Sequence, residues 1–268
     1  MTSFTRGCGH EVHPTIYTRV FYYYDWIQSI IDPQITTVRP PISRQVFACD
    51  SQSYQCGCSV TNVSISMEND GIQASTKIDI VDPQSWSMIV SIVRSGLSSK
   101  CTGTIISDHF ILTAAHCVTQ IDDLNSVVVL TRADHIWSVS GIWIHPNYSS
   151  EIPDLHDLAI LRLNVSLDLK ASASLRMACI HSLNDTISNH LKNSSWFISV
   201  HWRSPFLNNV STNHSIQQLV MKPIDITDIS CPARIEHQRY RFCAGSSAQQ
   251  LGIYVDSLQR TKNLQYSF

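Results

Sequence analysis

From about residue 86 onward, the sequence alternates short apolar runs with turn-forming residues, and this pattern limits the possible folds most strongly. Turn pairs such as Ser-Asp, Asp-His, Pro-Asn and Asn-Asn separate runs that are rich in β-branched and aromatic residues. The runs are WSMIVSIV, CTGTIIS, FILTAA, SVVVL, IWSVSGIWI, LAILRL, WFISV and QQLVMKPIDI. Many short strands with hardly any helical periodicity predict an all-β barrel or sandwich.

Composition excludes several classes of protein. The chain has 268 residues, of which 43% are hydrophobic and 15% charged, so it can bury a substantial core. A net charge of −2 gives no basic footprint for a nucleic-acid partner, and no apolar run approaches the roughly 18 residues of a membrane span. The start, MTSFTRGCGHEV, lacks the apolar segment of a signal peptide.

Other features are nevertheless typical of exported proteins. The chain has nine cysteines and seven Asn-X-Ser/Thr glycosylation sequences, which favour an extracellular, disulfide-bonded glycoprotein. The sequences begin at Asn62, Asn147, Asn164, Asn184, Asn193, Asn209 and Asn213. Zinc is the rival explanation for clustered cysteines, but Cys56 and Cys58 are closer in sequence than usual ligands and no histidine pair follows. We therefore expect disulfides, no metal and no cofactor.

Two residues are candidates for acid–base chemistry. His116 follows the apolar run of ILTAAHC, and Asp157 precedes the run LAILRL, 41 residues later. Hydrolysis of a peptide bond by a serine needs an imidazole base and a buried carboxylate that holds the imidazole in the right tautomer. Each signal alone is weak, because a histidine near a strand usually has no catalytic role. The other eleven histidines, His156 included, are interpreted as structural or surface residues.

In combination, these motifs resemble the chymotrypsin/trypsin family of serine endopeptidases. CTGTIISDHFILTAAHC and HDLAILRLN resemble its histidine and aspartate motifs, and WSMIVSIV its first barrel strand. MACI around Cys179 is similar to the loop that tethers the propeptide, and DISCPARIEHQRYRFCAG to a disulfide loop. The resemblance covers residues 65–259. It implies two six-stranded antiparallel β-barrels, polypeptide substrates or inhibitors as partners, His116 as general base and Asp157 as its orienting carboxylate.

The resemblance fails at the nucleophile. The family carries its serine in a Gly-Asp-Ser-Gly-Gly segment, whose turn also forms the oxyanion hole. Here residues 256–259, Asp-Ser-Leu-Gln, resemble the family's Asp-Ser-Cys-Gln, and Arg-Thr-Lys follows at residues 260–262. By this match Asp256 is the carboxylate of a pocket for Lys or Arg side chains. Neither Ser257 nor Ser267 is placed to replace the nucleophile, so we expect an incomplete second barrel and no peptide cleavage by a serine.

The segment that matches the family's activation cleavage site also departs from the family pattern. The matching stretch, SISMENDGIQAS, has no basic cleavage residue and no Ile-Val-Gly-Gly. Two functional hypotheses stay open. The chain is a serine endopeptidase whose nucleophile is missing only from this reading of its gene, or a non-catalytic pseudoprotease that acts as a binding or decoy module. A fragment without function is a weaker third.

The first 31 residues resemble the carboxy-terminal segment of the same family, placed at the opposite end. GCGHEVHPTIYTRVFYYYDWI contains its Gly-Cys loop, its strand and its terminal helix. The segment is either the tail of a preceding protease domain or a permuted piece that folds back, and we expect it to dock onto the second barrel. The predicted organisation is therefore this fragment at 1–31, a Cys/Pro/Ser-rich linker or propeptide at 32–64, and a protease domain truncated at its nucleophile segment at 65–268.

The resemblance also implies a disulfide pattern. Cys8 has no partner, because Leu258 replaces the cysteine that it pairs with in the family. The other eight cysteines pair as Cys49–Cys56, Cys58–Cys179, Cys101–Cys117 and Cys231–Cys243. The order of Cys56 and Cys58 is left open.

Overall fold

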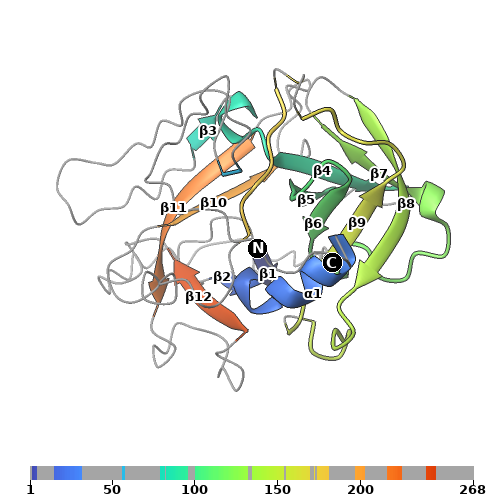
Figure 1. The fold of residues 1–268 in the computed structure, drawn as a ribbon. Coiled ribbons are helices and arrows are strands. Elements are labelled where there is room, and N and C mark those ends of the chain that lie inside the picture. Colours follow the sequence, from blue (N-terminus) through green and yellow to red (C-terminus); the bar gives the residue numbers. More distant parts are fainter. Residues whose placement is uncertain are drawn as a thin grey trace, which may run out of the picture.

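The computed structural model describes thirteen stretches of the chain, and the account below concerns these residues. They are 2–4, 15–31, 56–57, 79–81, 83–95, 100–131, 135–153, 155–169, 172, 174–180, 197–202, 216–224 and 240–245. Figure 1 shows a barrel on the right, a second sheet on the left, and a short helix below and between them. No helix in these stretches is both long and apolar enough to cross a membrane.

Six antiparallel strands close into a barrel in the order β4-β5-β6-β9-β8-β7. These strands are β4 (Ile89–Arg94), β5 (Lys100–Ile105), β6 (Phe110–Thr113), β7 (Val127–Leu130), β8 (Ile136–Ile144) and β9 (Ala159–Leu163). Of three short 3₁₀ helices, η2 (Pro83–Trp86) precedes β4, and η3 (Ala115–Cys117) and η4 (Leu124–Ser126) lie between β6 and β7. The closed barrel confirms the all-β prediction for this half of the protein.

β-branched and leucine side chains fill the barrel, as the apolar runs predicted. Val90, Ile111, Val129 and Leu161 are buried in one cluster contributed by four strands. Gly103 on β5 is required by this packing, because an added Cβ would lie 2.7 Å from Cγ2 of Ile111. The interior therefore has no room for a side chain at this position.

The second sheet has six strands, with the order β1-β2-β12-β11-β10 and β3 paired to β11. The strands are β1 (Thr2–Phe4), β2 (Thr15–Thr18), β3 (Asp79–Val81), β10 (Phe197–Trp202), β11 (Ile216–Ile224) and β12 (Arg241–Gly245). Among the described strands this sheet is open, and an incomplete second barrel stays a prediction. The backbone N–H of Trp202 donates to Oγ1 of Thr102 at 3.3 Å, which joins this sheet to the barrel.

The amino-terminal segment docks onto both halves of the protein. Strand β2 pairs with β12, with Ile16 opposite Cys243. After η1 (Val20–Tyr23), helix α1 (Tyr24–Ile31) packs against the barrel, where Ile27 is fully buried in a cluster with Leu158 and Ile160. The segment thus docks onto the second sheet, as expected, and its helix also covers one end of the barrel (Figure 1).

Two complete disulfides are described. Cys101–Cys117 forms as expected, with a Cα–Cα distance of 6.2 Å. The pairing Cys58–Cys179, named first above, is wrong, since Cys179 pairs with Cys56. The N–H of Gly57, which has a positive φ of 80°, donates to the Met177 carbonyl, and this turn sets Cys56 beside Cys179.

The remaining cysteine predictions are only partly covered. Cys243 is disulfide-bonded. Its expected partner Cys231, together with Cys8, Cys49 and Cys58, lies outside the described residues, as do most of the expected linker at 32–64 and Asp256.

Candidate active site

Strand register brings His116 and Asp157 together. Strands β6 and β9 are antiparallel neighbours, and Thr113 at the end of β6 lies opposite Ala159 at the start of β9. His116 follows Thr113 by three residues, and Asp157 precedes Ala159 by two. Both side chains therefore leave the barrel at the same point of its rim, although they are 41 residues apart in sequence.

The Asp157 carboxylate accepts two hydrogen bonds from His116. Its Oδ2 lies 2.7 Å from Nδ1 of the imidazole, and its Oδ1 accepts the backbone N–H of His116 at 2.9 Å. The Asp157 side chain is fully buried, whereas 40% of the His116 side chain is exposed. A buried carboxylate that binds both ring and backbone fixes the rotation of the imidazole and keeps its proton on Nδ1.

This tautomer leaves Nε2 of His116 unprotonated, with a lone pair that can accept a proton. Such a nitrogen can take a proton from a nucleophile, and the imidazolium that forms is stabilised by the adjacent carboxylate. Within the described part of the chain, no serine hydroxyl lies within hydrogen-bonding distance of His116. The atom that does lie near Nε2 is Sγ of Cys117, at 3.4 Å.

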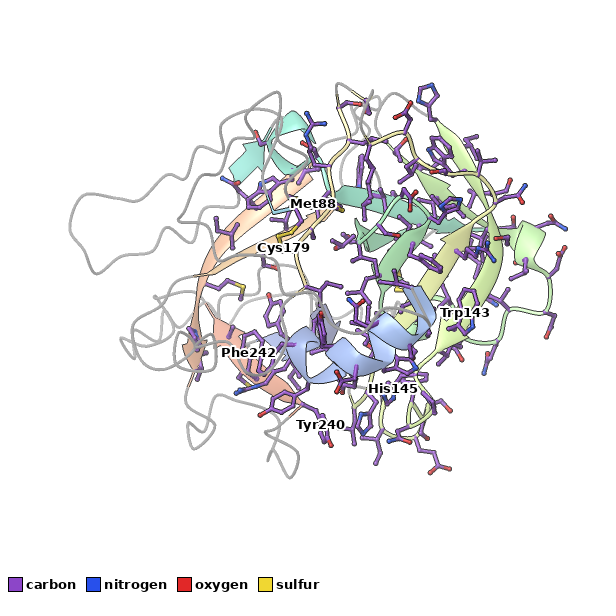
Figure 2. All side chains as sticks on the ribbon, viewed as in Figure 1. Met88, Trp143, His145, Cys179, Tyr240 and Phe242 are labelled. Carbon is purple, nitrogen blue, oxygen red and sulfur yellow. A yellow bond between two sulfur atoms is a disulfide. The ribbon has the colours of Figure 1, made fainter. Side chains whose placement is uncertain are left out.

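An aromatic and histidine cluster supports the loop that carries Asp157. The hydroxyl of Tyr23, from the amino-terminal segment, lies 3.0 Å from Nδ1 of His156, and the rings of His145 and His156 stack with centroids 5.1 Å apart. Tyr240 packs against His156 with centroids 4.7 Å apart, and Figure 2 shows His145 and Tyr240 beside α1. His156 adopts a left-handed φ of 55° and directly precedes Asp157.

The expectation that His156 is a structural or surface residue agrees with these contacts, but the sequence did not indicate which residues it contacts. His156 connects the amino-terminal segment to the Asp157 loop through a hydrogen bond and an edge-on ring contact, both with Tyr23. The available signal was the pair His145 and His156 on either side of a turn, together with the Tyr and Trp residues of the amino-terminal segment. Only the packing of that segment shows that these histidines and aromatic residues are in contact.

Burial shifts the pKa values of two groups near the site. Burial, and next the neighbouring His156, lower the pKa of His145 from 6.5 to about 4, so His145 is neutral at pH 7. Burial, and next the negative charge of Asp157, raise the pKa of Tyr148, so its hydroxyl stays protonated. At neutral pH, neither His145 nor Tyr148 therefore adds a charge near Asp157.

Comparison with known proteins supports the same interpretation. The family model described as Trypsin matches residues 77–251, which is more than half of the chain. Complement factor B of Bos taurus is 31% identical over 105 residues, 36% of this chain and 14% of that protein.

Two further relatives match in part. Ovochymase of Halocynthia roretzi is 30% identical over 149 residues, which are 52% of this chain and 9% of that protein. The serine protease Hayan of Drosophila melanogaster is 35% identical over 91 residues, 31% of this chain and 14% of its own length. The matches thus span only a small part of each of these relatives.

Proposed function

The chain belongs to the trypsin family of serine proteases, and from this premise we propose that it carries the general-base half of a serine endopeptidase site. In this proposal His116 is the base and Asp157 is the carboxylate that orients it. The observation that carries the proposal is the 2.7 Å contact between Nδ1 of His116 and a fully buried Oδ2 of Asp157. A surface ion pair has no need of such burial, whereas a catalytic dyad does.

The proposal includes the loss of the serine nucleophile. The position expected for Gly-Asp-Ser-Gly-Gly contains Arg260, Thr261 and Lys262. Without a hydroxyl near Nε2, the base has no proton to take and no acyl-enzyme can form. The chain with this sequence is therefore inactive as a serine endopeptidase, and it acts on polypeptides by binding them.

The second candidate function is catalytic. A nucleophile outside the described residues would restore a complete triad, and the buried Asp157 favours this alternative, because a binding module gains nothing from an oriented base. Asp256, if it lines the specificity pocket, would direct either function toward Lys or Arg side chains. The two disulfides and the exposed sequon residues Asn147 and Asn164 support an extracellular location.

The test combines covalent labelling, turnover and binding. The chain is incubated with a fluorophosphonate probe and with chromogenic peptides that carry Lys or Arg before the scissile bond, and peptide binding is followed by calorimetry. We expect no label, no turnover above that of the His116→Ala variant, and measurable binding of peptide.

The matched control is His109→Ala. His109 also contacts a carboxylate, Asp108 at 3.3 Å, but both groups of this pair are partly exposed, whereas Asp157 is fully buried beside His116. Turnover that is lost in His116→Ala and kept in His109→Ala would refute the proposal that the chain is inactive, and it would establish the catalytic function. Absence of both turnover and peptide binding would refute both functions.

A further inference from the structure

We propose that Cys101, Cys117 and His116 form a zinc site when the disulfide between the two cysteines is reduced. The Sγ atoms of both cysteines and a ring nitrogen of His116 lie within 4.8 Å of one another. Two thiolates and one imidazole are a ligand set that binds Zn²⁺ and leaves a fourth position open for water. The inference concerns binding and does not depend on whether the chain cleaves peptides.

The distances fit a tetrahedral ion with little movement of His116. Zinc bonds of about 2.3 Å to sulfur and about 2.05 Å to nitrogen place a sulfur and a nitrogen about 3.6 Å apart on a tetrahedron. Nε2 of His116 already lies 3.4 Å from Sγ of Cys117. The two sulfurs, once released, must separate to about 3.8 Å. Cα atoms 6.2 Å apart allow this by side-chain rotation alone.

Asp157 prepares the imidazole for a metal as well as for a proton. Because the buried carboxylate holds the hydrogen on Nδ1, the lone pair of Nε2 faces the sulfurs. Histidine ligands of zinc usually donate their second N–H to a carboxylate in this way, which fixes the tautomer and raises ligand basicity. Asp157 would be a positioning residue that touches no metal.

The site is accessible to a thiol reductant and to zinc. His116 is 40% exposed at its side chain, and both cysteines are partly exposed. A low-molecular-weight thiol opens the disulfide: two molecules of the thiol are oxidised to their own disulfide, and Cys101 and Cys117 each gain a hydrogen on sulfur. Zinc then displaces the two thiol protons to solvent and binds the neutral imidazole at Nε2. The ion is bound to Nε2 of His116, the atom that would take a proton in general-base catalysis, so zinc binding and base catalysis exclude each other.

The experiment measures metal uptake by the whole chain before and after reduction. A water-soluble phosphine serves as reductant because it offers no sulfur ligand. Zinc affinity is measured against a chromophoric chelator, and Co²⁺ is used to count thiolate ligands from the intensity of its sulfur charge-transfer band. We expect one ion with two thiolates in the reduced chain and no such ion in the oxidised chain.

Variants assign the ion to these residues. Cys101→Ser with Cys117→Ser should abolish the two-thiolate signal, and His116→Ala should weaken zinc binding at least tenfold. Asp157→Asn should weaken it about 10- to 100-fold, because the imidazole takes the other tautomer. Matched controls are Cys56→Ser with Cys179→Ser, which removes the other described disulfide, and His135→Ala, which removes an exposed histidine outside the cluster.

Near-ultraviolet circular dichroism records whether each reduced chain is folded. A reduced chain that takes up no metal with two thiolates overturns the proposal, whether it is folded or not. An equal signal in the Cys101→Ser, Cys117→Ser variant would also overturn it, since other cysteines would then hold the ion. Affinity that is insensitive to both His116→Ala and Asp157→Asn would remove histidine from the ligand set.

Discussion

Acidification should weaken the fold through His145, which packs between the amino-terminal segment and the barrel. Its ring stacks on His156 and meets the edges of Tyr23 and Trp26, each with centroids 5.0 Å away. The backbone N–H of Asn147 donates to Nδ1 at 3.2 Å, so this nitrogen carries no proton in the folded protein. Protonation would break that hydrogen bond and place a charge against a second imidazole.

The pKa of His145 gives the size and the direction of the effect. In the unfolded chain the imidazole titrates near 6.5, and in the folded protein at about 4. Between these values the unfolded chain binds the additional proton, so the free energy of unfolding decreases as the pH falls from about 6.5 to about 4. The difference corresponds to about 3.4 kcal/mol at most. Because His145 is only partly buried, solvent screening reduces the expected loss to about 1.5–2 kcal/mol.

Urea unfolding at pH 7, 5.5 and 4, at constant ionic strength, measures this loss by tryptophan fluorescence. Other groups titrate too, so the informative quantity is the difference between the protein and its His145→Phe variant, which keeps a ring but cannot bind a proton. We expect the variant to lose about 1.5–2 kcal/mol less over this range. The exposed residue His135 supplies the control His135→Phe, with an unchanged pH dependence. Parallel pH dependences of the protein and His145→Phe would refute the reasoning.

Three substitutions test other contacts. Ile27→Ala empties a fully buried position between α1 and the barrel and should cost about 2–5 kcal/mol in urea unfolding, whereas Ser29→Ala, exposed on the same helix, should change the free energy by no more than about 0.5 kcal/mol. Gly103→Ala should lower stability by about 1–3 kcal/mol, because its Cβ meets the barrel core. Asp157→Asn should move the imidazole proton of His116 to Nε2, which ¹⁵N NMR of the ring detects, because the amide oxygen accepts the backbone N–H of His116 and the amide NH₂ then donates to Nδ1. A proton that remains on Nδ1 would contradict the proposed role of Asp157.

The barrel was predictable from sequence because its strands carry a local signal. Each run of β-branched and leucine residues between turn residues forms one strand of the barrel, and β6 pairs with β9 although β7 and β8 lie between them in sequence. The proximity of His116 to Asp157 was predictable only through the resemblance. In isolation, a histidine after one strand and an aspartate before another give no information about which strands are neighbours.

Other features depend on contacts that no local pattern encodes. The choice between Cys56 and Cys58 as the partner of Cys179 is made by the Gly57 turn and its hydrogen bond to Met177. Two cysteines one residue apart have the same local sequence signal, so the sequence left both pairings open. The position of the leading segment was likewise decided by long-range packing, in which Tyr23 and Ile27 fill a site on the barrel.

The amino-terminal segment ties the geometry of the candidate dyad to the assembly of the whole fold. Tyr23 contacts His156, and Ile27 packs with Leu158, so the two residues that flank Asp157 are both held by a segment more than 100 positions earlier in the chain. The carboxylate itself is buried and holds the ring of His116. Loss of the segment would therefore expose the Asp157 loop and loosen the imidazole, although none of its described residues is hydrogen-bonded to His116. Orientation of the base is in this sense a property of the docked segment as well as of the barrel rim.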